Sequence, residues 1–118
     1  MGDRIRILLV DDEPFILKAV ARVMRGWPVE LHTAPDAGAA LRLLESVQPR
    51  LLISDYRMPG KTGVELLLEA RRRLSPCPLL VLHTGQPIPP GEIFEGMILL
   101  EKPASEAQLR ALVDQAAA

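Results

Sequence analysis

The chain contains one cysteine, Cys77, and therefore cannot form an internal disulfide bond or a metal cluster of thiolates. Neither charge is in excess, because 14 lysine and arginine residues face 15 aspartate and glutamate residues, for a net charge of −1. Phosphate contacts require a basic surplus, so direct nucleic-acid binding is not expected. No apolar run approaches the roughly 18 residues of a membrane span, and the N-terminus has no signal-peptide core. These absences predict a cytoplasmic protein that binds neither nucleic acid nor membrane.

The composition that remains is that of an ordinary globular domain, with 48% hydrophobic and 25% charged residues. The length of 118 residues suffices for one compact domain and is too short for two. We therefore expect a single domain over residues 1–118.

Short apolar runs recur along the chain and predict its strands. Four runs have no polar alternation, as is typical of parallel strands covered on both faces, and they span residues 5–10, 51–53, 79–82 and 97–100. Residues 29–33 do alternate, which indicates an edge strand.

Between these runs, apolar residues recur at the spacing of amphipathic helices, in stripes that begin at Phe15, Ala37, Val64 and Leu109. The interval between the fourth and fifth strands has no such stripe and contains three prolines within residues 87–90. It predicts a loop with at most one helical turn, around Ile93 and Phe94. Strands that alternate with helices indicate an α/β fold, a doubly wound five-stranded parallel sheet whose fourth helix is shortened or missing.

Polar side chains gather where the predicted strands end. Ligands of open parallel sheets bind at the carboxyl ends of the strands. The residues found there are Asp11, Asp12 and Glu13, then Ser54 and Asp55, then His83 and Thr84, and finally Glu101 and Lys102. Lysine is scarce, with three residues against 11 arginines, so its presence at this edge is informative. His83, in contrast, is expected to pack against a helix.

This set of side chains indicates phosphoryl chemistry. Carboxylates that lie close together repel one another unless a positive charge compensates them. Oxygen ligands of this kind suit Mg²⁺. A metal beside a free carboxylate, a hydroxyl group and a lysine can neutralise phosphoryl oxygens, while the carboxylate acts as the nucleophile.

Four motifs occur in this order: LLVDDEP, SDYRMPGKTG, LHTG and EKP. Together they resemble the receiver domain of two-component response regulators, of the chemotaxis-regulator type, over residues 4–116. The resemblance implies a flavodoxin-like sheet with strand order 2-1-3-4-5. We expect a receiver domain with no output domain within these 118 residues, either a stand-alone receiver or one cut from a longer protein. It would act on an unknown output domain or partner protein.

The resemblance implies a Mg²⁺ site. Asp12 and Asp55 would bind the metal directly, and Asp11 largely through water. The backbone carbonyl group of Arg57 would complete the protein ligands.

The resemblance also implies that Asp55 accepts a phosphoryl group from a sensor histidine kinase or a phosphotransfer protein. Thr84 would hydrogen-bond one phosphoryl oxygen and Lys102 would pair with another. Such a domain is a switch rather than an enzyme, since it catalyses only its own phosphotransfer and dephosphorylation. We also expect a cis peptide between Lys102 and Pro103, because the lysine must turn back over the sheet directly after its strand.

Two features depart from the family pattern. Leu99 stands where the family usually has an aromatic residue, and the fourth helix is replaced by the proline-rich interval. Both belong to the face that normally transmits the signal, so the departures concern output rather than chemistry.

Two other functional classes remain open. A phosphatase of the haloacid dehalogenase type also uses an aspartate nucleophile and Mg²⁺, and Asp11 followed by Glu13 matches its motif loosely. The chain is, however, too short for the cap of such an enzyme. A pseudo-receiver would instead bind a partner without phosphorylation.

Overall fold

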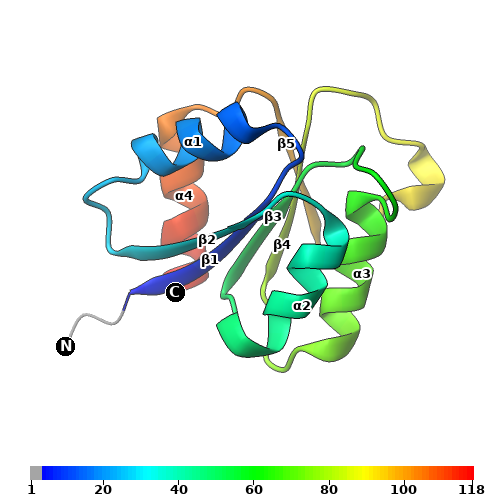
Figure 1. The fold of residues 1–118 in the computed structure, drawn as a ribbon, viewed down its shortest axis with the longest axis horizontal. Helices are drawn as coiled ribbons and strands as arrows, with labels where there is room; N and C mark the ends of the chain where they lie inside the picture. Colours follow the sequence, from blue (N-terminus) through cyan, green and yellow to red (C-terminus); the bar gives the residue numbers. More distant parts are fainter. Residues whose placement is uncertain (1–3) are drawn as a thin grey trace.

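The sheet of this protein has five strands, all parallel, in a computed structural model that describes residues 4–118. The strands are β1 (Ile5–Val10), β2 (Val29–Ala34), β3 (Leu51–Ser54), β4 (Leu79–Thr84) and β5 (Met97–Glu101). Their order is β2-β1-β3-β4-β5, as predicted, with β2 and β5 at the edges (Figure 1). This order places β1 and β3 side by side at the switch point, where ligands of such sheets bind.

Within the part of the chain that the structure describes, four helices cover the sheet. They are α1 (Pro14–Val23), α2 (Ala37–Val47), α3 (Gly63–Arg73) and α4 (Glu106–Ala117). Helices α2 and α3 lie on one face and α1 and α4 on the other (Figure 1). Helices α3 and α4 begin with complete capping boxes at Thr62 and Ser105, which satisfy amide groups that have no partner inside the helix.

The uninterrupted apolar runs reflect burial on both faces of the sheet. Along β1, Leu8 packs toward α2 and α3, whereas Ile7 and Leu9 pack toward α1 and α4. All three are essentially inaccessible to solvent. Each such side chain stabilises the fold by about 1.5–3 kcal/mol relative to an exposed one. A rigid central strand therefore ends directly at the aspartates that follow it.

The connection from β4 to β5 contains only one short turn of 3₁₀ helix, η1 (Pro90–Glu92). The sequence predicted a single turn, but near Ile93 and Phe94, so its position was wrong by about three residues. Pro90 explains the difference, because proline suits the first turn of a helix, where no amide donor is needed. Within residues 4–118, no helix is long and apolar enough to cross a membrane.

Candidate functional site

Three carboxylates meet at the carboxyl edge of the sheet. Asp11 and Asp12 follow β1, and Asp55 follows β3. One carboxylate oxygen from each lies within 4.8 Å of the others. Asp11 and Asp55 are buried, whereas Asp12 is exposed to solvent. The sequence prediction that these three acids form one cluster is therefore confirmed.

Backbone hydrogen bonds extend the sheet through the two buried acids and fix their positions. The Asp11 amide donates to the Ala34 carbonyl group at 3.1 Å, and the Asp55 amide donates to the Val10 carbonyl group at 2.9 Å. The Asp55 Oδ1 atom in turn accepts a hydrogen bond from the Tyr56 amide at 2.8 Å. Side chains held in this way are positioned before any ligand arrives.

Helix α3 approaches the Asp55 backbone so closely that its first residue must be glycine. A Cβ atom on Gly63 would lie 2.0 Å from the Asp55 carbonyl oxygen, far inside van der Waals contact. The Gly63 amide also donates a hydrogen bond to the Tyr56 carbonyl group at 2.8 Å. The second glycine of the SDYRMPGKTG motif, Gly63, is thus required by this packing.

Lys102 supplies the positive charge of the cluster. Its Nζ atom lies 2.9 Å from Asp11 Oδ2, 3.4 Å from Asp55 Oδ1 and 3.5 Å from Glu13 Oε1. One ammonium group therefore faces three carboxylates, and the cluster retains negative charge.

The peptide that follows Lys102, Lys102–Pro103, is cis, as predicted. The Ser75–Pro76 peptide is cis as well.

The pKa values reflect this imbalance. Burial raises the pKa of Asp55, and the charge of Asp11 raises it further, while Lys102 acts in the opposite direction. Burial acts to lower the pKa of Lys102, but the Asp11 and Asp55 carboxylates outweigh it and raise that pKa overall. The lysine is thus firmly charged, whereas ionised Asp55 is only partly compensated and would gain from a further cation.

The donor set fits a hard divalent cation such as Mg²⁺. All three acids offer oxygen, the ligand atom that this ion prefers, and carboxylates with water commonly complete its shell. The negative charge that Lys102 leaves uncompensated would also favour a cation here.

The other predicted site residues lie at the same edge but make different contacts. Thr84 ends β4, and its Oγ1 atom accepts a hydrogen bond from the Gln86 amide at 3.1 Å. Within residues 4–118, no hydrogen bond joins Thr84 to Asp55. The Arg57 side chain is exposed and donates to Gln86 Oε1 at 3.0 Å. His83 is buried and lies against helices, as the sequence predicted, since it lines a small cavity together with residues of α1 and α4.

Comparison with known proteins agrees with this geometry. The family model of the response regulator receiver domain matches residues 7–114. The chain belongs to this family.

Relatives of this receiver domain include regulators and a kinase. It is 28% identical over 113 residues to the transcriptional regulatory protein FixJ of Bradyrhizobium diazoefficiens, covering 93% of the chain and 55% of FixJ. It is 36% identical over 83 residues to the transcriptional regulatory protein TrcR of Mycobacterium tuberculosis, covering 69% of the chain and 32% of TrcR. It is 32% identical over 121 residues to the sensor histidine kinase TmoS of Ectopseudomonas mendocina, covering 95% of the chain and 12% of TmoS. The chain thus spans about half or less of each relative.

Solved structures share the whole fold of the receiver domain. The signal receiver domain of an HD domain-containing protein from Pseudomonas fluorescens Pf-5 is 31% identical, with a TM-score of 0.87 over 97% of this chain and 94% of that one. The chemotaxis response regulator CheY4 of Vibrio cholerae has the same fold, with 24% identity and a TM-score of 0.82 over 96% of this chain and 98% of that one.

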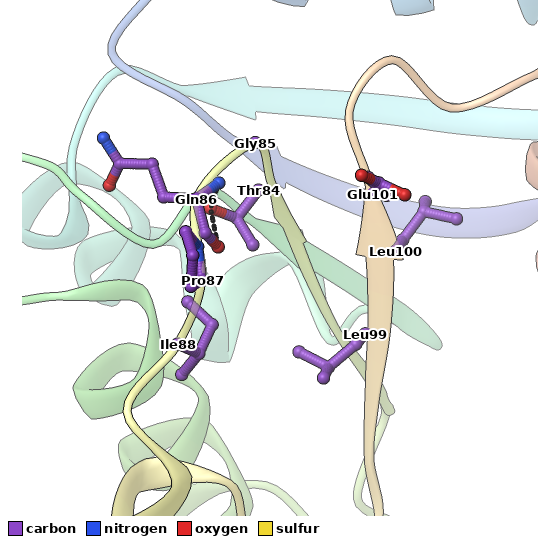
Figure 2. Close-up of a pocket in the computed structure, with 8 residues that line it drawn as sticks. All are labelled: Thr84, Gly85, Gln86, Pro87, Ile88, Leu99, Leu100 and Glu101. Carbon is purple, nitrogen blue, oxygen red and sulfur yellow. Dashed lines mark hydrogen bonds between the residues drawn. The ribbon is translucent and has the colours of Figure 1, made fainter.

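Beside the β4–β5 connection, which contains the turn η1 in place of a regular helix, this receiver domain has a groove of about 410 Å³. The groove lies between β5 and the start of the β4–β5 connection, and Leu99 points across it toward Ile88 (Figure 2). Leu99 is half exposed, so no bulky side chain fills this space.

Sequence reasoning missed two residues that link the site to this connection. Tyr56 directly follows Asp55, and its hydroxyl group donates to the Glu92 carboxylate, 2.9 Å from Oε1 and 3.0 Å from Oε2. The two residues are 36 positions apart, and no periodic pattern relates them. The one available signal was that Tyr56, the only tyrosine of the chain, stands next to the predicted acceptor.

Proposed function

We propose that this receiver domain accepts a phosphoryl group on Asp55 from the phosphohistidine of a sensor histidine kinase or phosphotransfer protein in the cytoplasm. The observation that carries the proposal is the placement of Asp55 Oδ1, buried at the end of a central strand and 3.4 Å from the Lys102 ammonium group. A carboxylate beside a fixed positive charge can act as a nucleophile toward an anionic group.

In the transfer, an Asp55 carboxylate oxygen attacks phosphorus and the P–N bond to the donor imidazole breaks. The imidazole nitrogen keeps the electron pair and takes a proton from water. Lys102 offsets charge on one phosphoryl oxygen, and the Thr84 hydroxyl group donates a hydrogen bond to another. Asp12 and Asp55 would hold Mg²⁺, together with Asp11 through water and the Arg57 carbonyl group, and the ion would neutralise phosphoryl charge.

The product would be an aspartyl phosphate that changes contacts with an output domain or partner protein. On this proposal the domain is a switch that acts on itself and turns over no external substrate. The relatives support a role in signalling, because TrcR and FixJ are named as transcriptional regulators and TmoS as a sensor histidine kinase.

The proposal is tested with acetyl phosphate and Mg²⁺, followed by intact-mass measurement. We expect the wild-type protein to gain one phosphoryl group that is labile to base, and Asp55→Asn to gain none. Asp114→Asn is a matched control, because it makes the same chemical change on exposed α4 and should behave as the wild type. An equally labile group on Asp55→Asn, formed at the wild-type rate, would refute the assignment. Continuous hydrolysis of a small phosphomonoester would instead support the phosphatase alternative.

A further inference from the structure

The segment between β4 and β5, residues 85–96, is held in place largely by contacts with neighbouring elements. Three prolines remove amide donors from it. Its own backbone bonds are short-range, from Glu92 to the Pro89 carbonyl group and from Ile93 to the Pro90 carbonyl group. Packing of Ile88 and Phe94 against the core provides apolar support. Its position therefore depends on side-chain bonds to neighbouring elements.

Two such bonds come from the residues that directly follow Asp55. Arg57 Nε donates to Gln86 Oε1 at 3.0 Å, at the start of the segment. The Tyr56 hydroxyl group donates to both Glu92 carboxylate oxygens, in the middle of the segment. Tyr56, unlike Arg57, also contacts the acceptor carboxylate, because its backbone amide group donates a hydrogen bond to Asp55 Oδ1. One residue thus touches both the phosphorylation site and the segment.

The Tyr56–Glu92 bond is partly protected from water. The Tyr56 side chain is buried and Glu92 is half-buried. Because the Glu92 carboxylate accepts this hydrogen bond, the pKa of the Tyr56 phenol is raised, which keeps the donor protonated. A hydrogen bond to a charged acceptor is among the stronger ones in proteins.

Thr84 connects the chemistry to the same segment. Its Oγ1 atom accepts a hydrogen bond from the Gln86 amide at 3.1 Å and donates one to the Gln86 carbonyl oxygen at 3.4 Å (Figure 2). In the proposed function the Thr84 hydroxyl group donates its single hydrogen to a phosphoryl oxygen, so it must give up its bond to the Gln86 carbonyl group. On this proposal the start of the segment moves, whereas Tyr56 keeps its position next to Asp55. The Tyr56–Glu92 bond opposes that movement.

We propose that Tyr56 is a positioning residue whose bond to Glu92 holds residues 85–96 in the arrangement of unphosphorylated Asp55. This inference rests on the proposed function and adds the route by which the state of Asp55 reaches the segment. Loss of the bond destabilises the unphosphorylated arrangement of residues 85–96 and makes the phosphorylated arrangement easier to reach.

The experiment is calorimetric titration with beryllofluoride, a phosphoryl mimic, in the presence of Mg²⁺. We expect Tyr56→Phe, which removes the bond, to bind the mimic about three- to tenfold more tightly than the wild type, the range of one hydrogen bond. Glu92→Gln leaves only a neutral amide oxygen as the acceptor, so it should tighten binding in the same direction but by less. The double variant should bind no more tightly than Tyr56→Phe alone, because without the tyrosine hydroxyl group there is no bond left for the second change to weaken. Hydrogen exchange should show residues 85–96 less protected in all three variants before the mimic is added.

Glu95→Gln is the matched control, since Glu95 is exposed on the same segment and makes no hydrogen bond or ion pair within residues 4–118. It should bind the mimic with wild-type affinity. Unchanged or weaker affinity in both single variants, or additive effects in the double variant, would overturn the inference while leaving the proposed function intact. A wild-type protein that binds no beryllofluoride would overturn both.

Discussion

At the scale of single residues, the site combines groups that the sheet holds in fixed positions with groups that are free to move. Asp11 and Asp55 are tied by backbone bonds to neighbouring strands, and Lys102 is paired with both. The Thr84 hydroxyl group, in contrast, bonds only to Gln86 of its own turn within the described residues. Fixed charges favour a defined geometry for the proposed phosphotransfer, and a hydroxyl group that is not tied to them is suited to report its outcome.

His83 should make the stability of the metal-free protein sensitive to acid. Burial lowers its pKa, and Lys102 lowers it further, while Asp11 acts in the opposite direction. The unfolded chain therefore binds a proton at higher pH than the folded one, and the free energy of unfolding falls as the pH drops below about 6.5. The loss is at most about 1.4 kcal/mol per pH unit. Urea unfolding between pH 5 and 8 should show that the free energy of unfolding of His83→Leu lacks this acid-dependent loss.

His32→Gln provides the control, because His32 is the other histidine and lies partly exposed beside Glu30. It should retain the acid sensitivity of the wild type. The same sensitivity in His83→Leu as in the wild type would show that other groups cause it.

At the scale of elements, the strands and helices were predictable because each has a local pattern. Strands buried on both faces form solid apolar runs, and each helix presents a stripe of apolar residues. The three aspartates and Lys102 were predictable for a related reason, since parallel strands all end at one edge. The Tyr56–Glu92 bond was not predictable, because it joins segments that are far apart in the sequence. The position of η1 was missed for a local reason, since Pro90 suits the first turn of a helix and places the turn before Ile93.

The junction between β3 and α3 depends on Gly63. A methyl group there would meet the Asp55 carbonyl oxygen at 2.0 Å, so the helix or the acceptor backbone must shift. We expect Gly63→Ala to lower the free energy of unfolding by about 2–3 kcal/mol, the upper range for overpacking. Gly91→Ala should cost far less, because no atom lies within 4 Å of the added position. Equal stability of the two variants in urea unfolding would contradict this account of the packing.

At the scale of the whole molecule, a nearly neutral chain concentrates negative charge at one edge of its sheet. The overall net charge is −1, yet Asp11, Asp12 and Asp55 lie together there, and the Lys102 ammonium group pairs with Asp11 and Asp55 of the three. Folding assembles this cluster from segments after β1, β3 and β5, so a metal that binds it is linked to the stability of the entire domain.

Mg²⁺ should therefore raise the melting temperature of the wild-type domain, with a rise that grows with the logarithm of the metal concentration above the dissociation constant. Asp12→Ala should abolish most of this rise, because it removes the exposed carboxylate that we propose as a direct ligand without disturbing the buried acids. Without metal, the same variant should melt no lower than the wild type, since removing one of several like charges relieves repulsion. Calorimetry with and without Mg²⁺ measures both effects, and Asp114→Asn should respond to the metal as the wild type does. A metal-free melting temperature lower by several degrees in Asp12→Ala would mean that this carboxylate stabilises the fold rather than straining it.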